Sequence, residues 1–264
     1  MTGLILRLAG LQQAWGERGV FHHRDTTAFP TRSALIGMFA AAGGRTREEA
    51  LTPYHRLPGS PSHHDLTFTI RIDTPGTLHH DFHTVGGGYP PEQRLRTGDG
   101  GTRSEAKSTL ISHRTYLAGA VFTLAVQGPR PLLDHIADAL EHPAFGTYLG
   151  RRSCLPDTPL VLATHSPDPV GELRNTVPLT LPAPPSDDTT HVPVTFVHEH
   201  PTNTAHASAL PDRESNSEPV EFTPTNRRHL PRPLWITTEN LRASLYAGPR
   251  PLDALATYIT QGHA

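Results

Sequence analysis

Apolar and polar residues alternate along several short stretches of the chain, and this period of two predicts β-strands. Four such strands are predicted in the first part of the chain, at residues 3–9, 65–73, 116–127 and 159–165. In the first two strands an arginine, Arg7 or Arg71, falls on the face opposite the apolar residues. We therefore expect one face of the resulting sheet to be core and the other to be polar.

Two stretches have apolar residues at helical spacing instead. One covers residues 31–42 and ends at Gly43 or Gly44, and the other opens at Pro131 and runs to His142. The elements alternate as β-α-β-β-α-β, the ferredoxin-like or RRM-like arrangement, in which two helices cover one face of an antiparallel sheet. We expect an α+β fold of this class, with the two arginines on its open face.

Residues 79–115 interrupt this pattern. The stretch Gly86–Lys107 has almost no apolar content but holds four basic residues, namely Arg94, Arg96, Arg103 and Lys107. We interpret residues 79–115 as a protruding hairpin or flexible arm between two strands. A disordered insertion explains the composition equally well.

The remainder of the chain has a weaker pattern. Residues 191–200 and 233–237 are predicted strands, residues 202–218 a polar loop, and residues 251–261 a short amphipathic helix. We divide the chain into a first unit, residues 1–165, and a small β-rich C-terminal region, residues 166–264.

Composition limits the function classes. A single cysteine, Cys154, excludes a disulfide framework within the chain and any multi-cysteine zinc site. We see neither an apolar run of membrane-spanning length nor a secretion signal, so we expect a cytoplasmic protein with no membrane partner. Residues 1–120 carry 13 basic and 10 acidic side chains, whereas residues 121–264 carry 10 and 15. Of the 23 basic residues, 22 are arginine, which suits phosphate recognition but also follows from a GC-rich genome.

The start of the 31–42 helix has the features of an anion site. Thr31 is the predicted N-cap, with its hydroxyl accepting from a free N–H of the first turn. Arg32 and Ser33 follow it, and a cation in the first turn opposes the helix dipole. A capped helix with a solvated arginine is the competing interpretation.

The chain has 18 histidines, and several stand in pairs that suggest other chemistry. His64-Asp65 and His80-Asp81 resemble the HD pair of metal phosphohydrolases, and the imidazoles of His198-Glu199-His200 share one strand face as a possible metal clip. His83 and His113 flank the arm and would form an acid–base pair if they met at its base. Surface histidines are the simpler explanation, and we expect no metal.

Cys154 follows Arg151 and Arg152, which would lower its pKa, but no partner base is identifiable. We therefore favour a structural thiol. Arg24, the 31–33 helix start, the arm and the turn Gly150-Arg151-Arg152-Ser153 would form a phosphate groove for single-stranded RNA if they converged.

An ordered series of short motifs spans residues 4–165. They are Arg7-Leu8-Ala9-Gly10, Gln13-Ala14-Trp15-Gly16, Arg24, Phe29-Pro30-Thr31-Arg32-Ser33 with Leu35 and Gly37, His83-Thr84-Val85, Arg114 with Tyr116-Leu117, and Tyr148-Leu149-Gly150-Arg151-Arg152-Ser153-Cys154. Together these motifs resemble CasD, a family of type I-E CRISPR Cascade subunits within the RAMP superfamily that hold the 5′ handle of the CRISPR RNA (crRNA).

The resemblance implies a ferredoxin-like palm with a thumb hairpin at about residues 79–115. It implies a non-catalytic, cofactor-free subunit that caps the crRNA 5′ handle beside the Cascade backbone subunit and the large PAM-reading subunit, and that meets target DNA only through the complex. By position, the handle contacts would be Arg24, Thr31, Arg32, Ser33, Gly150, Arg151, Arg152 and Ser153. The thumb contacts would be Arg94, Arg96, Arg103 and Lys107.

Three points stay open from the sequence. Trp15 either stacks on a base or plugs the palm. A metal-independent endoribonuclease that processes CRISPR repeat RNA, using His83 and His113, is the alternative function. A metal phosphohydrolase built on the His-Asp pairs is a third interpretation.

Overall fold

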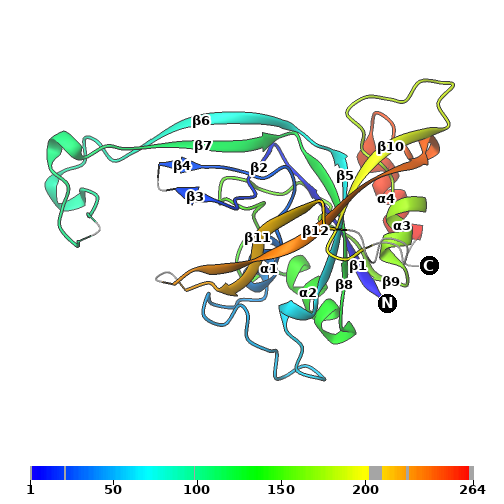
Figure 1. Cartoon of the computed structure of the whole chain (residues 1–264), viewed down its shortest axis with the longest axis horizontal. Coiled ribbons are helices and arrows are strands. Elements are labelled where there is room, and N and C mark those ends of the chain that lie inside the picture. Colours follow the sequence, from blue (N-terminus) through cyan, green and yellow to red (C-terminus); the bar gives the residue numbers. More distant parts are fainter. Residues whose placement is uncertain (1, 21, 98, 202–209, 224–225, 262–264) are drawn as a thin grey trace.

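The computed structural model describes residues 2–20, 22–97, 99–201, 210–223 and 226–261. Within this part of the chain, seven strands form one curled antiparallel sheet in the order β11-β12-β10-β5-β8-β1-β9 (Figure 1). Their bounds are β1 Gly3–Ala9, β5 Thr67–Thr74, β8 Val121–Gln127, β9 Val161–Ser166, β10 His191–His198, β11 Arg213–Glu221 and β12 Arg228–Arg242. The helices are α1 Arg32–Ala42, α2 Arg130–Glu141, α3 Pro169–Asn175 and α4 Pro251–Gln261. The expected α+β class is confirmed.

Strands β1, β5, β8 and β9 and helices α1 and α2 correspond to the six elements predicted in residues 1–165. Leu4, Leu6 and Leu8 of β1 are buried against the helices in the larger core. Pro131 stands in the first turn of α2, where its fixed φ suits the helix and its missing N–H costs nothing. The predicted strand at 116–127 is wrong in one respect, because a turn at Gly119, with φ +65°, divides it into two strands.

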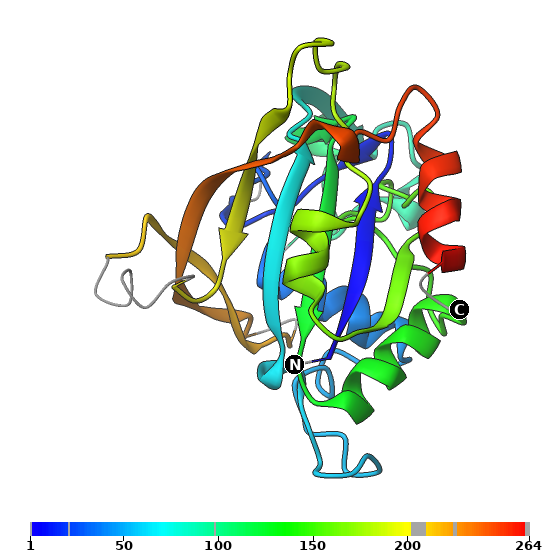
Figure 2. The same cartoon turned by 90° about the vertical axis from the view of Figure 1, so that its right-hand side faces the viewer.

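The expectation of an open, polar sheet face is wrong. Helices α3 and α4 cover that face, as Figure 2 shows, and a second apolar cluster fills the space beneath them. Arg71 is 0% exposed: its Nε donates to Asp73 at 2.7 Å, and its Nη1 donates to the carbonyl of Val177 at 3.0 Å. Arg7 is also buried, and burial lowers its pKa. The chain after residue 165 supplies the carbonyls that bond to Arg71, which the pattern of its own strand does not reveal.

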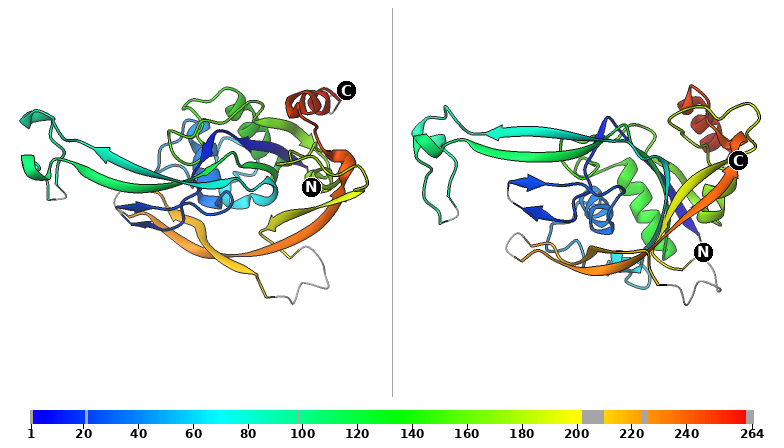
Figure 3. Two further views of the ribbon diagram at one scale, coloured as in Figure 1. Left: turned by 90° about the horizontal axis from the view of Figure 1, so that it is seen from above. Right: turned by 45° about the horizontal axis from the view of Figure 1, so that its top comes forward.

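The polar stretch after β5 is a long hairpin. Strands β6 Thr77–Val85 and β7 Leu110–Ala118 pair antiparallel over nine consecutive residue pairs. Three short strands complete a second sheet beside β7: β2 Gln12–Gln13, β3 Gly19–Val20 and β4 His23–Arg24. The hairpin β6–β7, with the residues between its strands, is called the arm below. The arm, β3–β4 and β11–β12 project to the same side of the molecule (Figure 3).

The C-terminal region differs from its prediction. Strand β10 and helix α4 confirm the elements expected at 191–200 and 251–261. The loop expected at 202–218 is wrong where it overlaps β11, and residues 202–209 lie outside the described residues. On β11 the buried face carries Ser215 and Ser217 in place of large apolar residues, so the sequence shows no apolar alternation. Strand β12 extends well beyond the predicted 233–237 because it pairs with β10 and β11 in succession. No helix in the described part of the chain has the length and apolar character needed to cross a membrane.

Candidate functional site

One face of α1 forms the floor of a groove of about 790 Å³. The opposite face of the helix packs Leu35, Ile36 and Phe39 into the core. The residues of α1 that line the groove are mostly small: Ser33, Ala34, Gly37, Met38, Ala40 and Ala41. A Cβ on Gly37 would meet no atom within 4 Å, so a ligand can approach the helix closely at this point.

The turn after α2 forms part of the groove wall. At Gly150 the backbone has φ +90°, and a Cβ there would collide with the carbonyl oxygen of Ala14. Only glycine fits this turn without strain, because it tolerates positive φ and needs no room for a side chain. The turn is thereby fixed against the segment that carries Trp15, and it presents Arg151 toward the arm.

Arg151 joins three segments at the base of the arm. Its Nη1 donates to the carbonyl of Thr115 on β7 at 3.0 Å, and its Nη2 donates to the carbonyl of Arg24 at 2.8 Å. The guanidinium also lies over the ring of Tyr116, 4.6 Å from its centroid. Arg151 therefore both lines the groove and holds β4 and β7 in place beside it.

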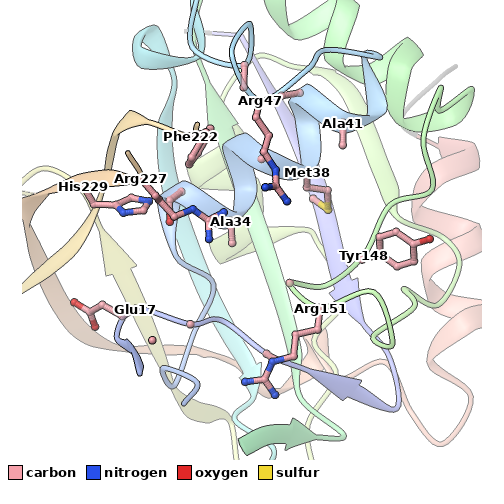
Figure 4. A pocket seen from close by; sticks show the side chains of 18 of the residues that line it. Glu17, Ala34, Met38, Ala41, Arg47, Tyr148, Arg151, Phe222, Arg227 and His229 are labelled. Carbon is pink, nitrogen blue, oxygen red and sulfur yellow. The ribbon is translucent and has the colours of Figure 1, made fainter. Parts of the chain in front are cut away.

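The groove is strongly basic. The arginines among its lining residues are Arg18, Arg24, Arg45, Arg47, Arg151 and Arg227, and the acidic lining residues are Glu17 and Asp25. Glu17 is itself paired with Arg213 on β11. Figure 4 shows Arg47 and Arg227 on one side of the space in front of α1 and Arg151 on the other. Positive charge thus surrounds a floor of small side chains.

Four of these arginines are available to a ligand. Arg18, Arg24, Arg47 and Arg227 are exposed, and their side chains form no hydrogen bond or ion pair with another described residue. Arg45 differs, because its Nη1 donates to the carbonyl of Thr52 at 2.6 Å and its guanidinium lies over the ring of Tyr54. The groove therefore offers four unengaged guanidinium groups, a number suited to an anionic polymer.

The structure brings together some of the residues predicted as handle contacts. Arg24, Ser33, Gly150 and Arg151 line the groove. Arg152 and Ser153 are exposed in the same turn but are not among its lining residues. Trp15 is fully buried, and its indole N–H donates to Gln13 Oε1 at 3.0 Å. This agrees with the expectation that Trp15 fills the interior of the palm, and it leaves no face of the indole ring exposed for stacking on a base.

Arg32 and Thr31 lie beneath the surface instead. Arg32 is 3% exposed and points away from the groove, into an ionic cluster with Glu199, Glu218 and Arg232. The predicted cap is also wrong: Thr31 holds the N-cap position but its buried hydroxyl makes no cap hydrogen bond. The start of α1 and Arg32 were expected to bind an external anion. The carboxylates of Glu199 and Glu218 occupy that position instead. Burial raises the pKa of Glu199, and the two arginines oppose this shift.

The four basic residues of the arm belong to the segment between β6 and β7, and Figure 1 shows this segment at the end of the hairpin remote from α1, which forms the groove floor. Arg94 pairs with Glu105, and Arg103 donates to the carbonyl of Lys107. Arg96 forms an isolated bridge with Thr102, and Lys107 is exposed. These four residues form a second basic region and do not extend the first.

The register of the arm separates the proposed acid–base pair. His83 lies opposite Ser112, and His113 lies opposite Phe82. Directly opposed residues share a face and neighbours alternate, so His83 and His113 project from opposite faces of the hairpin. The prediction that they meet is wrong. His113 stacks on His23 instead, with ring centroids 5.1 Å apart.

The metal-site hypotheses find no support in the described residues, among which no group of three or more His, Cys, Asp or Glu is arranged to hold a metal ion. His198 is buried beside Thr237, and Glu199 is in the ionic cluster with Arg32. Burial raises the pKa of Cys154 despite the nearby arginines, in agreement with a structural thiol.

Sequence reasoning missed Arg18, Arg45, Arg47 and Arg227 as groove residues. Arg45 and Arg47 directly follow the glycines that end α1. Their position at the end of the helix was the sequence feature that could have indicated a place beside the groove. Arg227 had no local signal, because it belongs to the loop between β11 and β12.

Comparison with known proteins shows that the chain with this fold and basic groove is a CRISPR-associated protein. The family model described as CRISPR-associated protein (Cas_Cas5) matches residues 3–232, and the chain belongs to this family. It is 32% identical over 188 residues to the CRISPR system Cascade subunit CasD of Escherichia coli (strain K12), covering 67% of this chain and 77% of that protein.

Two solved structures are similar over nearly the whole chain. A chain of a CRISPR RNA-guided surveillance complex superposes with a TM-score of 0.85 at 40% identity, covering 98% of this chain and 100% of that one. A structure described as a Cas protein superposes with a TM-score of 0.56 at 25% identity, covering 92% and 97%. The expected membership of the CRISPR Cascade group of proteins is confirmed.

Proposed function

We propose that this chain is a non-catalytic, RNA-binding subunit of a type I-E Cascade complex, and that the groove over α1 holds the 5′ handle of the crRNA. The observation that carries the proposal is the convergence of Arg24, Arg47 and Arg227 from three distant segments on one groove. Guanidinium groups bind phosphate through paired donors, and a floor of small side chains lets a sugar–phosphate backbone approach closely.

In this proposal the strands β5, β8, β1 and β9 form the ferredoxin-like palm of residues 1–165, and the arm is the thumb. Arg94, Arg96, Arg103 and Lys107 contact guide nucleotides beyond the handle, while Arg152 and Ser153 contact its edge. Arg32 and Thr31 act indirectly, by fixing the start of α1. The neighbours in the complex are the backbone subunit and the large PAM-reading subunit. Residues 166–264 form the C-terminal region beside the palm, and the protein acts in the cytoplasm without a cofactor.

The endoribonuclease alternative depended on His83 and His113 acting together. Because the register places them on opposite faces of the arm, no geometric observation favours cleavage. Incubation of the purified chain with repeat RNA in EDTA tests this directly: we expect bound, uncut RNA, and a discrete cut would restore the alternative.

The salt dependence of binding tests the proposal. We compare the wild-type chain with the triple variant Arg24→Gln, Arg47→Gln and Arg227→Gln, using a synthetic handle oligonucleotide. Removal of three phosphate contacts is expected to flatten the slope of log K against log salt concentration by about 2, since each contact to a single strand contributes about 0.7. Arg130→Gln is the matched control, because Arg130 is exposed on α2 and Asp134 is its only ion-pair partner among the described residues. An unchanged slope in the triple variant would contradict the proposal.

A further inference from the structure

Strand β6 is a long edge strand whose outer side is uncovered. It pairs with β7 along its whole length, and no described residue forms a backbone hydrogen bond with its other side. In Figure 1, β6 is the outermost strand of the arm, with β7 between it and β4. In an antiparallel ladder every second residue of an edge strand points its N–H and C=O away from the sheet. The outer side of β6 therefore presents a row of unpaired donors and acceptors.

The other edges of the described sheets are protected. At the β11 edge, Glu17 accepts a hydrogen bond from the backbone N–H of Asn216, and the strand contains Pro219 and two irregularities of register. Two further irregularities interrupt β9, and α2 and α4 pack beside it. At the ends of the second sheet, β2 and β3 are each only two residues long. Proteins use such devices, and lysine or proline, to prevent edges from pairing with other chains.

Strand β6 lacks these devices apart from one acidic side chain, Asp81, whose carboxylate lies 3.8 Å from Nδ1 of His83. Its sequence, TLHHDFHTV, contains no proline, lysine or arginine, and its nine pairs with β7 have no register shift. Two large apolar side chains on one face are also exposed, Leu78 at 63% and Phe82 at 61%. A regular edge with so little protection, carrying two exposed apolar residues four positions apart on one face, is a template for an added strand.

We propose that the outer edge of β6 binds an extended segment of another protein subunit, which adds as a further strand to the arm. The free backbone groups specify the extended conformation, because only a strand satisfies them in succession. Leu78 and Phe82 favour a segment that places apolar residues opposite these two positions, on the face that they share. The inference rests on the proposed function only in that it requires membership of a multi-subunit complex, and it does not depend on RNA in the groove.

Hydrogen–deuterium exchange of the β6 amides tests the proposal, with the isolated full chain compared with the complex purified after co-expression of the neighbouring genes. We expect alternate amides of β6 to exchange about tenfold more slowly in the complex, the factor that corresponds to about one net hydrogen bond each. The amides of β6 that already bond to β7 are the internal control and should change little. Equal exchange rates for all β6 amides in the two samples would overturn the proposal.

Photo-crosslinking identifies the occupant. Benzoylphenylalanine in place of Phe82 is expected to crosslink to one segment of another subunit in the assembled complex. The matched control is the same substitution at Phe145, which is 59% exposed in the loop after α2 and should give no such product. Crosslinks from position 82 only to crRNA, or only to a second copy of this chain, would overturn the proposal. The crRNA content of each preparation is measured separately, so that loss of RNA binding and loss of strand addition are distinguishable.

Discussion

The Nη1 atom of Arg32 lies 3.0 Å from Oε2 of Glu199, and this contact joins the start of α1 to the residue that follows β10. Both side chains are buried. Glu199 also accepts from the backbone N–H of Phe68 at 3.0 Å, and Arg232 on β12 pairs with the same carboxylate at 3.2 Å. The cluster therefore ties the hairpin β11–β12, which supplies Phe222, Arg227 and His229 to the groove, to the rest of the sheet.

Arg32→Gln should destabilise the fold strongly. Loss of Arg32 leaves a single guanidinium, that of Arg232, to compensate two carboxylates, and removal of one partner from a buried ion pair typically costs about 3–5 kcal/mol. The free energy of unfolding in urea measures the effect, and Arg130→Gln, which breaks an exposed ion pair, should change it by less than about 1 kcal/mol. If Arg32→Gln left stability intact but abolished crRNA binding, Arg32 would contact RNA directly, as its position in the sequence first indicated.

Two buried histidines should make stability depend on pH. Burial lowers the pKa of both His63 and His198 to about 4, from an ordinary value of 6.5. Between these values the unfolded chain binds protons that the folded chain does not, so stability falls as pH decreases from about 6.5 to about 4. His63 accepts from the Tyr54 hydroxyl and donates to the Ala50 carbonyl in its neutral form.

The variants His63→Gln and His198→Gln isolate this contribution. Each should reduce the loss of unfolding free energy between pH 6.5 and pH 4, because the proton uptake by that residue in the unfolded state is removed. Urea denaturation at a series of pH values provides the measurement. A pH dependence identical to that of wild type in both variants would show that other groups cause it.

Two substitutions of Gly37 should affect stability and RNA binding differently. Glycine within a helix is about 1 kcal/mol less favourable than alanine, and nothing in the fold occupies the position of its Cβ. Gly37→Ala should therefore raise the free energy of unfolding by up to about 1 kcal/mol. Gly37→Leu should remain folded but weaken crRNA binding, because the side chain enters the groove. Full crRNA binding by a folded Gly37→Leu chain would place the RNA elsewhere.

The six central elements of the first 165 residues could be predicted because they have apolar periods, whereas the short strands β2, β3 and β4 could not. In the C-terminal region β10 and α4 could be predicted in the same way, but β11 could not, since it buries Ser215 and Ser217 where a pattern requires large apolar residues. The groove was found in part: Gly150 and Arg151 stand in a conspicuous glycine–arginine turn, whereas Arg227 reaches the groove only through the pairing of β11 with β12. Arg32 and Arg71 look exposed from their own segments, yet partners more than 100 residues away bury them.

The tip of the arm should be dispensable for folding. Val85 lies directly opposite Leu110, so a two-residue Asn-Gly turn can replace residues 86–109. The urea midpoint of the shortened chain should match that of wild type, while binding of a crRNA longer than the handle should weaken through loss of Arg94, Arg96, Arg103 and Lys107. A large drop in the midpoint would show that the tip stabilises the palm.

The location of the handle in the assembled complex tests the central claim most directly. A 4-thiouridine placed in the 5′ handle of the crRNA is crosslinked by light, and the modified peptides are identified by mass spectrometry. We predict crosslinks to the segments that line the groove, residues 14–19, 24–25, 33–50, 146–151 and 227–229 together with Phe222. Crosslinks confined to the face covered by α3 and α4, with none in these segments, would contradict the account.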